Sequence, residues 1–148
     1  MKLKKSPLAP EKFPSLPSVK GLKIGTSKSN IRYKNRQDIL TVTFDNLASV
    51  AGVFTLSQIP AAPVNFCKKN LINGYAKGLV VNAGIANSFT GKKGINNNRK
   101  IANYFSKLIN ARQKDVFVCS TGVIGEQLPL LKTKRAIKSS YLSKKKNF

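Results

Sequence analysis

The segment from Asp115 to Gly125, which reads DVFVCSTGVIG, constrains the fold of this chain more than any other. Residues 116–118 are all β-branched or aromatic, which predicts a short buried strand. Small residues follow at once from Cys119 to Gly122, so backbone N–H groups and a hydroxyl reach the edge of a sheet without bulky neighbours. Such groups can stabilise a developing negative charge. On spacing alone, an ordinary exit from a strand into a turn is the commoner explanation, because Gly and Ser punctuate most turns.

A second segment has the same arrangement. Residues 79–81 form an apolar run, and a loop of polar and small residues follows as far as Gly94. This loop contains Asn82, Gly84, Asn87, Thr90 and Gly91. The sequence therefore predicts two buried strands that each open into a loop able to present polar groups.

The remaining pattern predicts an α+β fold, with mixed strands and covering helices. Alternating or β-branched apolar residues predict three further strands, within 19–31 and over 39–44 and 48–56. The two strands already described extend over 79–82 and 116–119. Asp45 and Asn46 supply turn chemistry between two of these runs, which predicts a hairpin there.

Helical periodicity predicts three helices, over 61–71, 98–110 and 129–143. Pro63 falls in the first turn of the first helix, where its missing N–H costs nothing, and Asn73-Gly74 ends that helix. One apolar face of the second helix is formed by Ile101, Tyr104, Phe105, Leu108 and Ile109. In the third helix, the residues expected to face inward are Leu130, Leu131, Ile137 and Tyr141.

Three segments are expected along the chain. Residues 1–20 form an extended arm rich in proline, 21–131 form the α+β domain, and 132–148 form a basic helical segment. A domain of this size buries roughly 70% of its unfolded surface. There is no apolar run of about 20 residues and no secretory signal, so the chain is expected to be cytoplasmic, without a membrane partner.

Charge is the most unusual bulk property of the chain. It has 27 Lys and Arg but only five Asp and Glu, which gives a formal net charge of +22. Clustered cations of this kind can bind nucleic acid. However, 22 of the 27 are lysines, whereas arginine is the residue favoured for bidentate phosphate and base contacts. The basic residues are also dispersed, so we expect no specific nucleic-acid partner. An acidic partner would relieve the self-repulsion.

The missing residue types exclude several kinds of site. The chain has no histidine, which removes Ser-His and Cys-His catalysis and the common zinc ligand sets. No two of its five acids lie within four residues of each other, so spacing gives no support for a carboxylate pair. Cys67 and Cys119 are expected to be reduced, largely buried thiols. No metal or resident cofactor is expected.

Four segments in order resemble one family: Ser6–Pro10 (SPLAP), Phe54–Val64 (FTLSQIPAAPV), Leu79–Gly94 and Asp115–Gly125. It is the bifunctional ornithine acetyltransferase (glutamate N-acetyltransferase) family of arginine biosynthesis, and the resemblance extends from about Ser6 to Leu130. It implies that the domain is part of a layered α/β/β/α fold. It also implies that the chain corresponds to the amino-terminal, or alpha, portion of such an enzyme.

The resemblance further implies a mechanism and partners. In this family the precursor cuts itself before a threonine, which becomes the nucleophile of a beta chain, and two alpha and two beta chains form a heterotetramer. The enzyme moves acetyl from N-acetylornithine to glutamate, and bifunctional members also use acetyl-coenzyme A as a co-substrate. Thr121 and Gly122 match the pair that forms the family's oxyanion hole.

Other family motifs are absent from the 148 residues. There is no Ala-Thr dipeptide, which is the cleavage site, and no Thr-Thr-Asp-Thr segment, so the chain alone is expected to be inactive. Within the matched loop, Ala83, Ile85 and Ser88 replace the family's Ser, Asn and Ala. Ile85 matters most, because it puts an apolar side chain where a loop amide could form hydrogen bonds. Leu56 stands where the family often has arginine.

Two alternatives to the acetyltransferase hypothesis remain open. One is a basic nucleic-acid-binding module, although the chain has no recognisable readout motif. The other is an inactive, truncated remnant of the enzyme.

Overall fold

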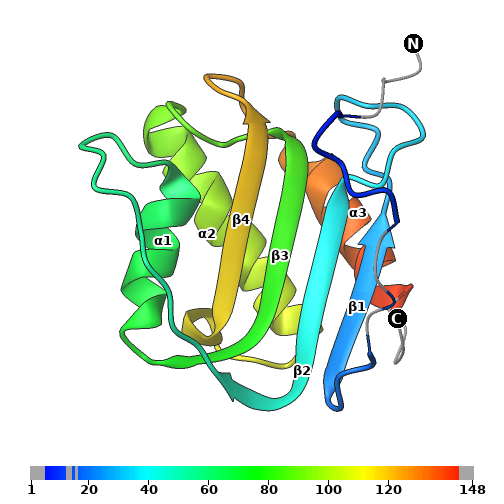
Figure 1. The fold of residues 1–148 in the computed structure, drawn as a ribbon. Helices are drawn as coiled ribbons and strands as arrows, with labels where there is room; N and C mark the ends of the chain where they lie inside the picture. Colours follow the sequence, from blue (N-terminus) through cyan, green and yellow to red (C-terminus); the bar gives the residue numbers. More distant parts are fainter. Residues whose placement is uncertain (1–5, 13–14, 16, 144–148) are drawn as a thin grey trace.

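Four strands form one mixed sheet in the order β1-β2-β3-β4 (Figure 1). The computed structural model describes residues 6–12, 15 and 17–143. The strands are β1 (Leu22–Ser27), β2 (Ile39–Ser49), β3 (Tyr75–Ile85) and β4 (Val116–Val123). Antiparallel pairing joins β1 to β2 and β2 to β3, whereas β4 runs parallel to β3.

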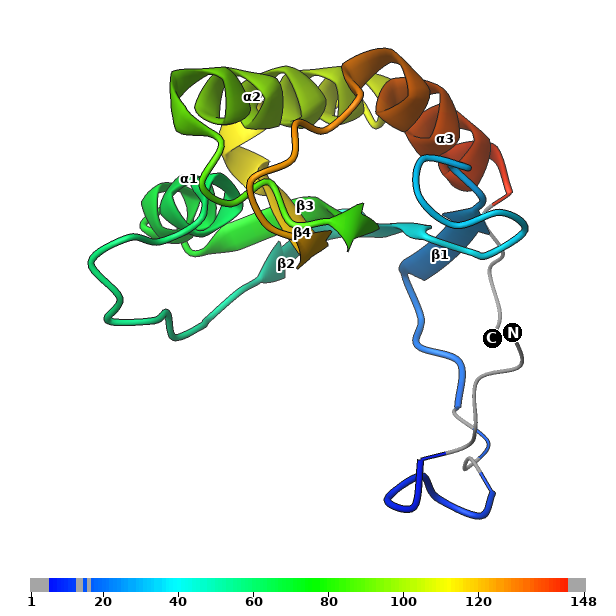
Figure 2. The ribbon, with the colours of Figure 1, turned by 90° about the horizontal axis from the view of Figure 1, so that it is seen from above.

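Three α-helices accompany this sheet: α1 (Ala62–Leu71), α2 (Gly91–Leu108) and α3 (Leu130–Leu142). Figure 2 shows α2 and α3 over one face of the sheet, and α1 beside the edge strand β4. The helix α2 and a short 3-10 helix, η1 (Gln113–Asp115), form the crossover that a parallel strand pair requires. The predicted α+β class, with mixed strands and covering helices, is confirmed.

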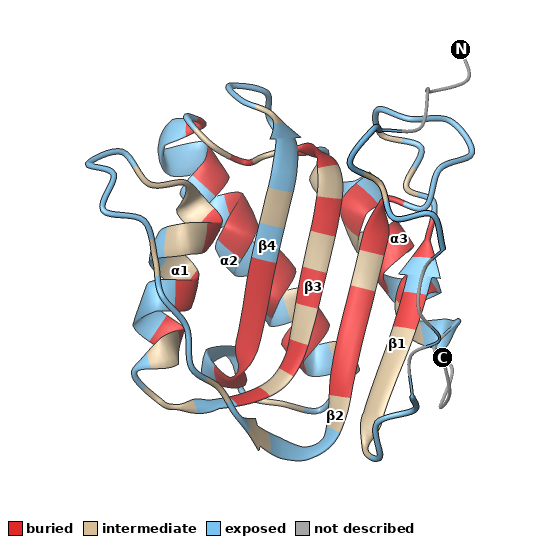
Figure 3. Cartoon of the chain, viewed as in Figure 1, coloured by how far each residue is buried: buried red, intermediate tan, exposed pale blue. Residues whose placement is uncertain are grey.

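The main core lies between the sheet and the helices α2 and α3. Alternate residues of the strands, such as Val80 and Val118, point toward the helices. There they pack with Ile101 and Phe105 of α2 and with Ile137 of α3. Figure 3 shows buried residues alternating with less buried ones along β3, and a continuous buried stretch at the start of β4. The predicted apolar face of the second helix is confirmed by this packing. In α3, by contrast, Leu131 is 73% exposed, so its expected inward position is wrong.

The expected hairpin at Asp45-Asn46 is wrong. Strand β2 continues through these residues to Ser49, and its register against β3 shifts between Thr43 and Ala48. A bulge of this kind absorbs polar residues without reversing the chain. The separate strand expected over 48–56 is also wrong, because β2 ends at Ser49 and residues 51–60 form an irregular segment that pairs with no strand.

The elements at the loops are longer than expected. Strands β3 and β4 end at Ile85 and Val123, beyond the predicted limits, and α2 begins at Gly91 instead of at residue 98. Residues 6–12 of the proline-rich arm contain turns and bends, whereas residues 1–5, 13, 14, 16 and 144–148 lie outside the described part of the chain. Within that part, no helix has the length and apolar character needed to cross a bilayer.

Candidate active site

The two loop-bearing segments lie side by side at one end of the sheet. In the parallel register of β3 and β4, Ala83 is opposite Thr121 and Gly84 is opposite Gly122. Parallel neighbours direct their carboxyl ends to the same edge of a sheet, so two segments far apart in the sequence deliver their polar residues together. The sequence identified both segments but did not predict that they are adjacent.

Gly84 and Gly122 allow the two backbones to approach closely. Both have positive φ angles, +111° and +124°. A Cβ added at Gly122 would lie only 2.3 Å from the carbonyl carbon of Gly84 and 2.5 Å from its oxygen. Only glycine fits at position 122, so the close approach of the two backbones depends on the absence of a side chain there.

Ser120 and Thr121 point to opposite faces of the sheet because strand residues alternate. The Ser120 hydroxyl donates to Oδ1 of the buried Asn82 at 2.6 Å, and Nδ2 of Asn82 donates to the carbonyl of Ile85 at 2.8 Å. Ser120 is therefore occupied on the helix-covered face. Thr121 lies on the opposite face and is exposed, as Figure 3 shows for the end of β4.

Helix α1 satisfies part of the free edge of β4. The Cys67 thiol donates to the carbonyl of Val118 at 3.2 Å and accepts from its N–H at 3.3 Å. The Asn70 amide donates to the carbonyl of Val116 at 2.8 Å. By the alternation of backbone groups along a strand, Ser120 and Gly122 direct theirs to this same edge, beyond the last side-chain bond from α1.

The loop after β3 is held by buried polar contacts. Thr90 Oγ1 donates to Oδ1 of Asn87 at 2.9 Å, and Nδ2 of Asn87 donates to the carbonyl of Gly94 at 3.2 Å. Asn87 is 1% exposed and has a φ of 47°, a conformation that asparagine tolerates better than most residues. These contacts explain why α2 starts at Gly91. Ile85 packs in the main core instead of reaching the loop surface.

Sequence reasoning missed three contributors to this end of the sheet. Asn82 and Ser120 were not linked, although a polar residue following a buried apolar run was the available signal. The third is the segment containing Arg32 and Tyr33, which packs against Gly84. Arg32 also forms an ion pair with Glu126 at 3.1 Å, just after β4. No local pattern indicates such a long-range pair.

Both cysteines are free thiols near this site. Burial raises the pKa of Cys67 to about 11, partly offset by its hydrogen bond with Val118 and reinforced by the neighbouring Cys119. Desolvation also raises the pKa of Cys119, which is nevertheless exposed by area, contrary to the expectation that it is buried. Neither thiol is therefore activated as a nucleophile. Across the described residues, no three Cys, Asp or Glu side chains gather into a group that could hold a metal ion.

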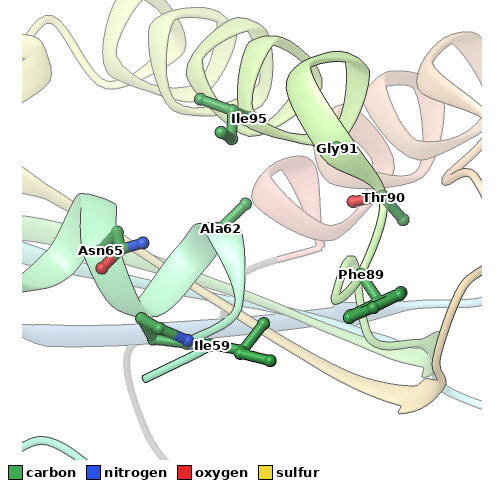
Figure 4. Close-up of a pocket in the computed structure, with 8 residues that line it drawn as sticks. Ile59, Ala62, Asn65, Phe89, Thr90, Gly91 and Ile95 are labelled. Atoms are coloured by element: carbon green, nitrogen blue, oxygen red, sulfur yellow. The ribbon is translucent and has the colours of Figure 1, made fainter. Parts of the chain in front are cut away.

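A pocket of about 430 Å³ lies next to the start of α2. Figure 4 shows Phe89 and Thr90 on one side of it, with Ala62 and Asn65 of α1 and Ile95 of α2 around the remainder. Phe89 is 74% exposed and has a φ of 58°, which is unusual for an aromatic residue.

The fold is the one found in a family of arginine biosynthesis proteins. The ArgJ family pattern matches residues 23–147. The chain belongs to the ArgJ family, as its four sequence segments predicted.

Individual relatives support this assignment. The chain is 49% identical over 127 residues to the arginine biosynthesis bifunctional protein ArgJ of Rhizobium meliloti, a match that covers 86% of this chain and 31% of that protein. It therefore spans about a third of the length of the curated relatives it matches.

Solved structures agree with the fold. The ornithine acetyltransferase of Mycobacterium tuberculosis, solved with ornithine, matches with a TM-score of 0.82 and 26% identity, covering 86% of this chain and 69% of that one. The arginine biosynthesis bifunctional protein of Bacillus halodurans matches with a TM-score of 0.77 and 31% identity, covering 80% and 62%.

Proposed function

We propose that this chain is the alpha portion of an acetyltransferase that moves acetyl from N-acetylornithine to glutamate in arginine biosynthesis, in the cytoplasm. Acetyl-coenzyme A is a second acetyl donor in this proposal. Family membership supports the general assignment, because the relatives named above are arginine biosynthesis proteins and an ornithine acetyltransferase. The two free thiols agree with a reducing compartment.

Thr121 and Gly122 form the oxyanion hole in this proposal. The observation that carries it is the register that places Gly84 against Gly122 and leaves the exposed Thr121 beside them. The Thr121 hydroxyl and the Gly122 N–H are two uncharged hydrogen-bond donors at the end of β4. Donors fixed in this way stabilise a negative oxygen without reorganising during the reaction.

The chemistry requires a nucleophile from a second chain. A threonine at the amino terminus of the beta chain attacks the acetyl carbonyl of N-acetylornithine, and its own α-amino group accepts the hydroxyl proton. The carbonyl oxygen becomes negative and accepts hydrogen bonds from Thr121 and Gly122. Collapse of this intermediate expels ornithine, whose amine receives the proton. The glutamate amine then attacks the acetyl carbon, the bond from that carbon to the threonine oxygen breaks, and the proton lost by the amine returns to the threonine oxygen as N-acetylglutamate leaves.

The helix-free face of the sheet is where the beta chain would pack. The described part of the chain places no helix over this face (Figure 2). Its residues are largely apolar and include Leu40, Val42, Leu79, Val81 and Phe117. Near β4 this face is partly covered, because Phe117 and Leu79 pack with Cys67 and Leu71 of α1 and with Val50 and Phe54 of the segment after β2. Covering such a face with another layer would bury more apolar surface and stabilise the chain further. Two alpha and two beta chains would then assemble as a heterotetramer, and Thr121 would face the incoming layer.

Thr121→Ala tests the proposal in the complete enzyme, with the complementing chain present. We expect kcat to fall roughly 100-fold or more, as for other single oxyanion donors, with little change in KM. The free energy of unfolding should fall by no more than about 1–2 kcal/mol. Turnover is measured with N-acetylornithine and glutamate.

Val118→Ala is the matched control on the same strand. Val118 is 2% exposed and faces the core, so this change should cost about 2 kcal/mol of stability and leave kcat largely intact in the folded enzyme. The oxyanion assignment is wrong if Thr121→Ala keeps full turnover but unfolds the protein.

A further inference from the structure

A groove runs between α1 and α2, away from the strand ends that carry Thr121. It consists of the pocket of about 430 Å³ in Figure 4 and a second pocket of about 690 Å³. The two are continuous, because both are lined by Ala62 and Asn65 of α1 and by Ile95 of α2. Each has the size of a small-molecule site.

The two ends of the groove differ in chemistry. At the end next to the start of α2, the lining is mainly apolar and includes Ile59 and Phe89. At the other end, three cations line it: Lys69, Arg99 and Lys114. A ligand that fits both ends therefore has an anionic part and a flat or apolar part.

Among the described residues, the cations of the groove form no salt bridge with an acid. In the described part of the chain, the salt bridges join Asp45 to Lys23, Glu126 to Arg32 and Asp115 to Arg112. Asp38 accepts hydrogen bonds from the backbone N–H and the hydroxyl of Ser29. These four acids therefore all have partners outside the groove. The positive charge at this end of the groove is left for an external anion.

Asn98 gives the second, independent indication of a ligand. It lines the cationic pocket and is 1% exposed, yet neither its Nδ2 nor its Oδ1 has a hydrogen-bond partner. Its polar neighbours are satisfied, since Asn70 donates to Val116 and Gln113 donates to the Arg99 carbonyl. A buried amide whose donor and acceptor are both unpaired requires an explanation, and contact with a ligand supplies one.

We propose that this groove binds a purine nucleotide. The phosphates lie against Lys69, Arg99 and Lys114, where the guanidinium fork of Arg99 suits phosphate oxygens. The base lies toward the apolar end. Asn98 lies at the phosphate end, where an amide with a free donor and a free acceptor suits the ribose hydroxyls and phosphate oxygens that join the base to the phosphates. Asn98 is shielded from water in this conformation, so its side chain turns into the groove when the nucleotide enters.

Helical spacing places these groups together. Asn65 and Lys69 are four residues apart on α1, and Ile95 is followed at three and four residues by Asn98 and Arg99 on α2. Residues with these spacings share one face of a helix. The two helices therefore present matching polar and apolar positions along the two walls.

The test is calorimetric titration of the purified 148-residue chain with ADP at near-physiological salt, with adenosine and inorganic pyrophosphate as separate probes. We expect ADP to bind at least tenfold more tightly than either part alone. Arg99→Gln should weaken ADP binding about tenfold, as the loss of one charged hydrogen-bonding partner does. Arg135→Gln, an equal charge change on exposed α3, should have less than a twofold effect.

Asn98→Ala separates a ligand contact from a structural role. It removes two unsatisfied polar atoms, so the unliganded variant should unfold at a higher temperature while ADP binds several-fold more weakly. The proposal is overturned if ADP does not bind at millimolar concentration, or if Arg99→Gln and Arg135→Gln weaken it equally. It is also overturned if pyrophosphate binds as tightly as ADP, or if Asn98→Ala leaves ADP affinity unchanged.

Discussion

Two glycines with positive φ angles follow each other closely at the end of β4, but their surroundings differ. A Cβ at Gly122 would overlap the Gly84 backbone, whereas a Cβ at Gly125 would have no atom within 4 Å. Gly122→Ala should therefore lower the free energy of unfolding by about 3 kcal/mol or more, through strain and a clash. Gly125→Ala should cost only the strain, about 1 kcal/mol. Equal losses in urea unfolding would show that the contact between the two backbones is unimportant.

The Cys67 thiol should make the free energy of unfolding depend on pH in the alkaline range. In the unfolded chain it ionises near its ordinary pKa of 9.0, whereas in the folded protein burial raises the pKa to about 11. The folded state holds the proton longer, so its stability is complete below pH 9 and declines as the pH rises toward 11.

The measurement is the difference in unfolding free energy between the wild type and Cys67→Ser across this range. Serine keeps a hydroxyl for the Val118 backbone but does not titrate there, so lysine deprotonation affects both proteins alike. The wild type should lose stability relative to the variant as the pH rises. Parallel curves would contradict the role of Cys67.

At the scale of elements, α1 protects the edge of the sheet. Besides its bond to Val116, Asn70 donates to the carbonyl of Gln113 at 3.1 Å. Asn70→Ala should cost about 1–3 kcal/mol, because it leaves buried carbonyl groups without a donor. The exposed edge should also make the variant more prone to aggregate. Thermal unfolding and light scattering measure both effects, and Lys68→Ala on the exposed face of α1 is the control. Similar behaviour of the two variants would contradict edge protection.

The sequence predicted the positions of α1 and α3 to within a residue or so, because Pro63, Gly74 and Pro129 mark their ends chemically. It failed where tertiary contacts decide. The Asp45-Asn46 pair has turn chemistry, but β2 is held on both sides by neighbouring strands and continues through it. The start of α2 depends on the contact of Asn87 with Thr90, which no helical periodicity reveals.

The site was predicted in part for the same reason. Thr121 and Gly122 stand out because small residues follow a buried strand, and their role as an oxyanion hole stays a prediction. The contact of Gly84 with Gly122 depends on the parallel pairing across α2, which is a property of topology. The ion pair of Arg32 with Glu126 spans 94 residues of sequence and has no local signal.

At the scale of the whole molecule, the isolated chain should have no acetyltransferase activity. The reason is chemical: these 148 residues have no histidine and no Ala-Thr cleavage site to generate an amino-terminal nucleophile. The assay uses the purified chain with N-acetylornithine and glutamate, and then with a complementing beta chain added. Activity should appear only in the second case. Turnover by the chain alone that disappears on denaturation would falsify the proposed division between alpha and beta chains.

The alternation along β4 places two kinds of selection on one strand. The side chains of Val116 and Val118 are buried and serve only to pack the core. Other apolar residues of similar volume can therefore replace them during evolution. Thr121, on the opposite face, contributes little to packing and would be retained only while the reaction is needed. In a lineage that obtains arginine from its surroundings, Thr121 should be among the first residues of the strand to drift, while the valines persist as long as the protein folds.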